Sequence, residues 1–522
     1  MKLQKRNLVV LIILIILMSS FRIDYRFKNT VECCSDDYDY FLHASTIAID
    51  FDLNYENQQP RAYSYNNNDT NTPIGFIGTG ILSAPFLYIG NLTSNLLNEN
   101  TNETIMNYKL LLYSISPIVY FFFTLLILLR LLTVFKINTN KFVVLYFLSS
   151  SGITYYAFER FSMTHTYEVF SLSLLMLISA KIYTSDKNIY YYLLPVSVLI
   201  NFLTRMSNFY IFIIPIIIKL LLNKKNLIIK KKIVNDSKLI ISSCLSFLIY
   251  YLISNELYGK FLINPQIVYG SNISIVDSVL KKGLLFQDLL SLIKTFFIVM
   301  FSFEFGLFWT SPVLFAGIIY ILINFRKIEN ILILLCFGQN FFIIHIWQSA
   351  GSSYGFRYLF SLIPLSVLII FLYKDKFKIL YYYLLVFSSV GILSVLFFET
   401  TELTQLSTEA QTNSFGKSIR YVEPDYVVGL FNSLLEVNSY LIIFTTSLLG
   451  AVFFKLILSI IEIENLNSIL TNLGLPVENN DFQNYILNIN QISISKILVI
   501  VLMFLYISYY FVYKISDNTF NE

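Results

Sequence analysis

Long apolar segments separated by short charged loops dominate the chain. Segments of roughly 18–20 apolar residues are long enough to cross about 30 Å of hydrocarbon as α-helices. We predict spans near residues 7–22, 108–130, 142–158, 166–184, 188–204, 207–223, 238–254, 309–325, 330–347, 358–373, 379–398, 438–461 and 496–513. Such uninterrupted runs exclude a transmembrane β-barrel. The pattern predicts an all-α polytopic membrane protein with about 13 transmembrane helices.

One further apolar segment, 284–303, is expected not to cross the membrane. It is interrupted by Asp288 and Lys294. If it crossed, the following basic loop at Arg326 and Lys327 would change sides. We therefore interpret the segment as a re-entrant or interfacial helix on the exterior side.

The positions of Lys and Arg set the expected orientation. Loops on one predicted side carry clusters of cations, whereas the short loops on the other side hold the single cations Arg160, Arg205 and Arg357. The basic side is expected to be cytoplasmic. This threading gives large exterior loops near 23–107, 255–308 and 399–437, with the C-terminus outside.

Two units are expected from this threading. Residues 1–461 would form a transmembrane catalytic domain, and 462–522 a cytoplasmic loop plus a terminal transmembrane helix. The first apolar segment resembles a signal peptide in length and basic flank, but no small-residue cleavage site follows it, so we interpret it as a retained anchor. There is no internal repeat, which weakens an inverted-repeat transporter interpretation.

Composition supports this class and excludes others. Of the 522 residues, 56% are hydrophobic and 13% are charged, and the mean hydropathy is +0.64. The net charge of +4 is small and comes from loop cations, so no nucleic-acid surface is predicted. The sequence has no zinc-ligand spacing, phosphate-binding Gly loop or nucleotide fingerprint. Its four cysteines do not define a disulfide framework.

An acidic, aromatic cluster follows the first span directly. Asp36, Asp37 and Asp39 place three carboxylates within four residues at a membrane exit. Such carboxylates repel one another and attract cations, so a general base or a metal site would explain them. The alternatives are a solvated acidic loop, or Asp residues that favour the start of the following helix through its dipole.

Several motifs on the predicted exterior side resemble those of one family. They are Asp36-Asp37 with Tyr40 and Ala44, Asp50–Asn57, Pro73–Phe86, Tyr155–Glu168, Phe301–Pro312 and Trp347–Tyr358. In this order they resemble the polyprenyl-phosphate-sugar-dependent membrane glycosyltransferases of the GT-C superfamily, which includes protein O-mannosyltransferases and lipid A aminoarabinose transferases. Many members have Asp-Glu in place of Asp36-Asp37, and the stretch 462–495 has no counterpart there.

The resemblance implies a membrane glycosyltransferase that moves a sugar from a polyprenyl-phosphate donor to a lipid, glycan or protein acceptor. The site would face the exterior or periplasm from the plasma (inner) membrane. Transfer needs a base, cations for the departing phosphate and an apolar groove for the lipid tail. Asp36 is expected to be the base, with Asp37 as its partner. No cofactor is required, and a divalent Mg²⁺ or Mn²⁺ is compatible with the acidic cluster.

The remaining predicted site residues would bind substrate. Arg357 in a Gly-flanked turn is expected to bind phosphate through its fork of donors, assisted by Arg205. His165 and Glu168 share a helix face and are expected to orient the acceptor. Tyr40 joins them by its place in the motif. The alternatives are an interfacial snorkelling Arg357 and a purely intrahelical His165–Glu168 pair.

A transporter or flippase of lipid-linked sugars without transferase activity is the main alternative. A transporter would be expected to carry charged or Gly/Pro-broken sites at mid-membrane, and a flippase to carry cations in a central cavity. Here the ionisable residues gather at the predicted exterior ends of the spans and in loops. This distribution favours the transferase.

Overall fold

The structure is a computed structural model. It describes residues 35–57, 64–67, 70–73, 75–99, 107–185, 187–205, 208–227, 236–259, 286–303, 305–347, 354–397, 437–473 and 480–516, with positions 13, 15–19, 21, 261, 430–431 and 434–435 between them. Residues 262–285 of the predicted loop near 255–308, and most of the predicted loop near 399–437, lie outside these residues.

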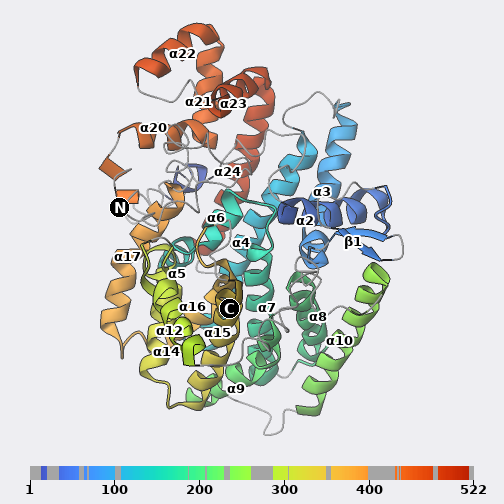
Figure 1. Cartoon of the computed structure of the whole chain (residues 1–522), viewed down its shortest axis with the longest axis vertical. Coiled ribbons are helices and arrows are strands. Elements are labelled where there is room, and N and C mark those ends of the chain that lie inside the picture. The colour runs from blue at the N-terminus through green and yellow to red at the C-terminus, as the bar shows by residue number, and fades with distance from the viewer. Residues whose placement is uncertain are drawn as a thin grey trace.

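Helices α4 to α17 form the body of the molecule (Figure 1). Their bounds are α4 Tyr108–Val134, α5 Lys141–Ser149, α6 Ile153–Phe158, α7 His165–Thr184, α8 Ile189–Thr204, α9 Ile214–Lys224, α10 Asp236–Tyr258, α12 Phe286–Phe301, α13 Leu307–Thr310, α14 Pro312–Ile323, α15 Ile328–Trp347, α16 Ile363–Tyr373 and α17 Lys378–Leu396. Large apolar side chains such as Phe121, Leu175 and Leu368 are fully buried between them.

Within the described ranges, five helices are long and apolar enough to cross a membrane. They are Tyr108–Val134, His165–Thr184, Ile328–His345, Lys378–Leu396 and Ile494–Tyr513. Shorter apolar helices accompany them, among them Ile189–Thr204 and Pro312–Ile323. The multi-pass helical class predicted from the sequence is confirmed, and the number of about 13 crossings stays a prediction.

The bundle has two chemically different ends. At one end, which we call the basic end, Lys374 donates to the Asn138 carbonyl at 3.2 Å and Lys224 pairs with Glu329 at 2.7 Å. At the opposite end α4 and α7 begin and α8 ends, and we call it the site end. The loops predicted to lie together as the basic, cytoplasmic side therefore do meet at one end of the bundle.

The segment before α4 packs on the site end. It contains α2 (Ser35–Ser45), a π-helical turn η2 (Thr46–Asp50), strands β1 (Ser64–Asn67) and β2 (Thr70–Pro73), and α3 (Ile77–Leu96). The two strands pair antiparallel from Ser64↔Pro73 to Asn67↔Thr70 and are the departure from an all-α fold among the described residues. Gly78 lets α3 touch the backbone of Leu203 and Thr204, where a Cβ would collide.

Four predicted spans of the body are interrupted at the site end. The span 142–158 divides into α5 and α6, 207–223 into η3 (Phe209–Phe212) and α9, 309–325 into α13 and α14, and 358–373 into η5 (Arg357–Leu362) and α16. In the last three, a proline stands in the first turn of the second helix. Proline has no N–H, and its ring disfavours helical geometry at the preceding residue. The helix is therefore broken before the proline, and the residues on that side form a separate short 3₁₀ or α-helical turn.

Helix α12 lies against the site end, in keeping with the interfacial helix predicted over 284–303. Thr295 hydrogen-bonds His345 near the end of α15 at 2.9 Å, and the Phe301 ring packs on Phe315 near the start of α14 at 5.4 Å. Both contacts reach the same end of the neighbouring helices. Residues 295–301 therefore run along that end.

The C-terminal region packs along α4. Lys496, at the start of α24 (Ile494–Ser516), forms an ion pair with Glu99, which follows α3. Further along, Phe511 stacks on Phe122 of α4 at 4.9 Å. Helix α24 therefore runs parallel to α4, and its start lies at the site end, beside the residues that follow α3. This arrangement differs from the predicted one, in which 462–495 is cytoplasmic and 23–107 is exterior.

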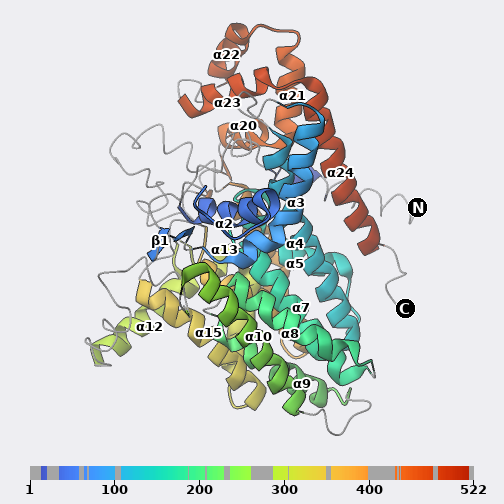
Figure 2. The same cartoon turned by 90° about the vertical axis from the view of Figure 1, so that its right-hand side faces the viewer.

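The span predicted over 438–461 also divides. Helix α20 (Val437–Thr446) and α21 (Leu448–Leu458) meet at a tight bend, where Gly450 approaches the Phe444 carbonyl. At about 1.5 Å per residue, neither helix is long enough to cross the hydrocarbon. With α22 (Ile463–Asn472) and α23 (Asn480–Gln491) they form a cap beyond the site end (Figures 1 and 2). Hydropathy alone overlooked the bend because both halves are apolar.

Candidate functional site

A buried ion pair fixes α2 to the turn between α6 and α7. The Arg160 guanidinium donates to the Asp37 carboxylate at 2.5 Å from Nη2 and 3.0 Å from Nε, and Ser162 donates to the Asp37 carbonyl at 2.6 Å. Asp37 and Arg160 are 2% and 8% exposed. The pairing gives each buried charge its counter-charge and several hydrogen bonds, which burial requires.

The structure describes the side chain of only one of the two predicted catalytic carboxylates. Asp36 lies in the first turn of α2, and its side chain is outside the described residues. Asp37 is held by Arg160, so a role for Asp37 as partner base would require this ion pair to open. Both roles stay predictions. The sequence shows Arg160 as a lone cation in a short turn. Its partner Asp37 lies 123 residues earlier, and no local pattern links the two.

His43, on the same helix, has a structural environment. Its Nδ1 lies 2.6 Å from the Tyr55 hydroxyl and its Nε2 2.9 Å from the Gly75 carbonyl. A carbonyl only accepts, so Nε2 carries the proton and Nδ1 accepts from Tyr55. Burial lowers the pKa of His43 to about 4, although the Gly75 carbonyl opposes the shift. Both ring nitrogens are engaged, and His43 ties α2 to the loop that precedes α3.

A second buried polar group lies at the start of α7. Glu168 Oε1 accepts from Arg205 Nη1 at 2.7 Å, and His165 Nδ1 lies 3.5 Å from the same oxygen. Glu168 Oε2 is buried and has no hydrogen-bond partner among the described residues. The His165 ring is enclosed by Tyr156, with centroids 4.6 Å apart. The His165–Glu168 pair is therefore not merely intrahelical, because Arg205 from the end of α8 completes it.

Arg357 and Arg205 converge on one aromatic ring. Arg205 Cζ lies 4.5 Å from the centroid of Tyr358, and Arg357 Cζ lies 5.6 Å from it. Gly355, with φ of +65°, supplies the left-handed turn that brings Arg357 inward, and Arg357 is only 9% exposed. Tyr40 of α2 is buried and contributes to the electrostatic environment of Arg205.

We call the residues His165, Glu168, Arg205, Arg357 and Tyr358 the arginine cluster. They come from α7, the end of α8 and η5, and Tyr40 of α2 adjoins them. Sequence analysis missed Tyr358 as a site residue, although it stands in the same motif as Arg357. Each member lies at an interruption or end of a helix, where non-helical backbone is tolerated at membrane depth if protein buries it. A fork of guanidinium donors in such a place suits an anionic group.

Hydrogen bonds between neighbouring elements hold the arginine cluster in place. The Tyr210 hydroxyl of η3 donates to Ser361 Oγ of η5 at 2.7 Å, and Asn340 of α15 donates to the same oxygen at 3.3 Å. On the other side, Asn201 of α8 donates to the Ser171 carbonyl of α7 at 2.9 Å. These bonds fix the relative positions of the elements that carry Glu168, Arg205 and Arg357.

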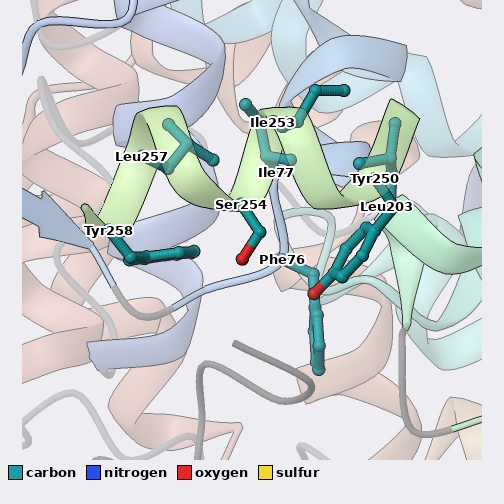
Figure 3. A pocket seen from close by; sticks show the side chains of 8 residues that line it. All are labelled: Phe76, Ile77, Leu203, Tyr250, Ile253, Ser254, Leu257 and Tyr258. Atoms are coloured by element: carbon teal, nitrogen blue, oxygen red, sulfur yellow. The ribbon is translucent and has the colours of Figure 1, made fainter. Parts of the chain in front are cut away.

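A small apolar groove lies on the side of α10 that faces α8 and α3 (Figure 3). Its walls come from α10, the end of α8 and the start of α3, and they include Phe76, Leu203, Tyr250 and Tyr258. Thr72 of β2 closes one end by donating to the Leu257 carbonyl at 2.6 Å. Leu203 stands two residues before Arg205.

Metal binding at the acidic segment would depend on Asp36, whose side chain is outside the described residues. Among the described residues, no group of three or more His, Cys, Asp or Glu side chains could hold a metal ion. The predicted Mg²⁺ or Mn²⁺ site would involve Asp36, so it stays a prediction.

A solved structure is similar to this chain, whereas family models and curated proteins are not. No protein-family model matches the chain, and no curated protein matches it. The crystal structure of the Archaeoglobus fulgidus oligosaccharyltransferase in the apo form is similar at 16% sequence identity and a TM-score of 0.38. The match covers 81% of this chain and 55% of that one, so the chain spans about half the length of that protein. At this level the similarity assigns neither fold nor function.

Proposed function

We propose that this protein is a membrane glycosyltransferase that transfers a sugar from a polyprenyl-phosphate donor to an acceptor at the site end. The observation that carries the proposal is the convergence of Arg205 and Arg357 on Tyr358, beside the buried carboxylate of Glu168. The motifs that resemble those of GT-C glycosyltransferases include Glu168, Arg357 and Tyr358, whereas Arg205 stands outside them.

The arginine cluster would bind the donor phosphate. Guanidinium groups bind phosphate through paired donors, and burial at a helix end strengthens this attraction by excluding water. The apolar groove, whose lining includes Leu203 at the end of α8, would receive part of the prenyl chain. One ligand with an anionic head and an apolar tail would thus use both features.

Asp36 would supply the base that deprotonates the acceptor. It stands one residue before Asp37, and the Asp37–Arg160 pair fixes that turn of α2 on the site end. Glu168 Oε2 and His165 would orient the acceptor hydroxyl or amine. Because the leaving group is a phosphate, no nucleotide enters the reaction. Divalent metal would act only if it binds Asp36.

The test is sugar transfer from synthetic short-chain polyprenyl-phosphate sugars by the full chain in detergent. We expect release of polyprenyl phosphate that depends on the protein, with a higher KM for the donor in Arg357→Ala. Arg326→Ala, an exposed cation at the basic end, is the matched control and should leave KM unchanged. No release from any donor in a panel of hexose and pentose carriers would overturn the proposal.

A lipid-linked-sugar transporter makes a different prediction. In proteoliposomes it would move the donor between leaflets without breaking the sugar–phosphate bond. Intact donor recovered on the opposite side, with no free polyprenyl phosphate, would replace the transferase with this alternative. Mass analysis of surface glycans in a deletion strain would then identify the sugar and the acceptor class.

A further inference from the structure

A pocket at the basic end lies far from the arginine cluster along the bundle, where α4 ends and α5 begins. It encloses about 430 Å³ of empty space, including its open mouth. Its lining combines two cations, Arg130 and Lys141, with hydroxyl side chains such as Thr133 and apolar side chains such as Leu129 and Ile137. Basic and apolar groups share one wall, and the described lining contains no Asp or Glu.

Further cations surround this pocket. Lys181, in the last turn of α7, has Arg130 and Lys187 as the charges that act on it. Lys374, from the turn between α16 and α17, donates to the carbonyl of Asn138 in the pocket lining at 3.2 Å. Like charges near one another repel, and an anion bound among them would offset that repulsion through its attraction to each cation.

The position along α4 determines what kind of anion fits. Helix α4 is long enough to cross a membrane, and Arg130 lies in its last turns. The pocket is therefore at the level where a bilayer presents its phosphate headgroups, and the apolar residues on its wall match the first carbons of an acyl chain. A soluble anion would make no use of that apolar wall.

We propose that this pocket binds the phosphate headgroup of an anionic phospholipid, with Arg130 and Lys141 on either side of the phosphate. The bound lipid would join the α4–α5 turn to the end of α7 and to the α16–α17 turn. This site is independent of the proposed transferase reaction and would exist in a transporter as well.

The experiment measures lipid retention by native mass spectrometry of the full chain in detergent, titrated with phosphatidylglycerol or with phosphatidylcholine. We expect preferential retention of phosphatidylglycerol, weakened about tenfold in the Arg130→Gln/Lys141→Gln variant. The matched control is Lys225→Gln/Arg326→Gln, which removes the same charge from exposed positions at the same end. It should change retention by less than about twofold.

A charge-preserving exchange separates the effect of lost charge from the effect of misfolding. Arg130→Lys/Lys141→Arg keeps both cations and should retain the lipid within about threefold of the wild type. If the Gln double variant does not elute as a folded monodisperse species, Lys141→Gln alone should give an intermediate loss. Equal losses in the pocket and control pairs would overturn the proposal, as would equal retention of phosphatidylcholine. Displacement of the lipid by millimolar inorganic phosphate would reassign the pocket to a soluble anion and also overturn it.

Discussion

Two buried ion pairs at the site end each join a carboxylate to an arginine, but they differ in how many carboxylate oxygens accept a hydrogen bond. Asp37 accepts from Arg160 through both carboxylate oxygens, and its backbone carbonyl accepts from Ser162. Glu168 accepts from Arg205 through Oε1, while Oε2 is buried without a hydrogen-bond partner among the described residues. A carboxylate bound through both oxygens is suited to holding elements together. One with a buried oxygen left over costs free energy unless a ligand completes it.

This contrast assigns different roles to neighbouring charges. The Asp37–Arg160 pair joins α2 to the α6–α7 turn and should matter chiefly for stability. The Glu168–Arg205 pair should matter chiefly for substrate. The two classes of effect can be separated by measuring unfolding and transfer on the same variants.

The largest effect is expected from breaking the Asp37–Arg160 pair. Arg160→Met leaves a buried carboxylate without its counter-charge and should lower the free energy of unfolding by about 3–5 kcal/mol. The double variant Asp37→Leu/Arg160→Met removes both charges and should be less destabilised than the single one. Thermal unfolding in detergent measures both. Equal losses would mean that the pairing itself contributes little.

A pH-dependent loss is expected from His43. Its pKa is about 4 in the folded protein, against an ordinary value of 6.5. The unfolded chain therefore takes up the proton first, and stability falls as the pH drops from about 6.5 to 4, by about 3 kcal/mol in total. His43→Gln should flatten this part of the unfolding profile. Parallel wild-type and variant curves would show that His43 is not buried in its neutral form.

At Glu168 we expect a smaller change in the free energy of unfolding but a larger change in the rate of sugar transfer. Glu168→Gln can still accept from Arg205, so the free energy of unfolding should fall less than in Arg160→Met. Loss of the carboxylate charge should lower transfer about 10²-fold, equivalent to about 2.7 kcal/mol. Asp36→Asn should give a similar loss if Asp36 is the base. Transfer that falls only in proportion to the folded fraction would place Glu168 with the stabilising pairs.

The smallest effect is expected outside both pairs, at the junction of the cap. Lys496 pairs with Glu99, and Glu99 also accepts from the Tyr108 N–H at 3.0 Å. Lys496→Met should lower the free energy of unfolding by about 1–2 kcal/mol, because Glu99 keeps its other partners. Lys496→Arg should retain most of it. Sugar transfer per folded molecule should not change. A loss of transfer without a loss of stability would indicate that the cap contributes to the site.

Much of the site could be anticipated from the chain, but not its internal connections. The pattern of the chain points to Arg205 and Arg357 as single cations in short loops, and to His165 and Glu168 as polar residues on one helix face. Their grouping around Tyr358 depends on the η5 turn, which follows from Pro364 and Gly355 only when the packing is known. Asp37 was predicted as a catalytic partner because sequence proximity to Asp36 is visible and spatial proximity to Arg160 is not.

The sequence by itself determined that the chain is a helical, multi-pass membrane protein with its basic loops at one end, because hydrophobicity and charge act on each segment separately. Only the tertiary structure decided that α24 runs parallel to α4 and that the segment 438–461 bends into a cap. It also decided that Arg160 is bound to Asp37. An apolar window has the same hydropathy whether it crosses, bends or reverses direction. Which of these occurs depends on contacts such as Lys496 with Glu99, whose partners lie hundreds of residues apart in the chain.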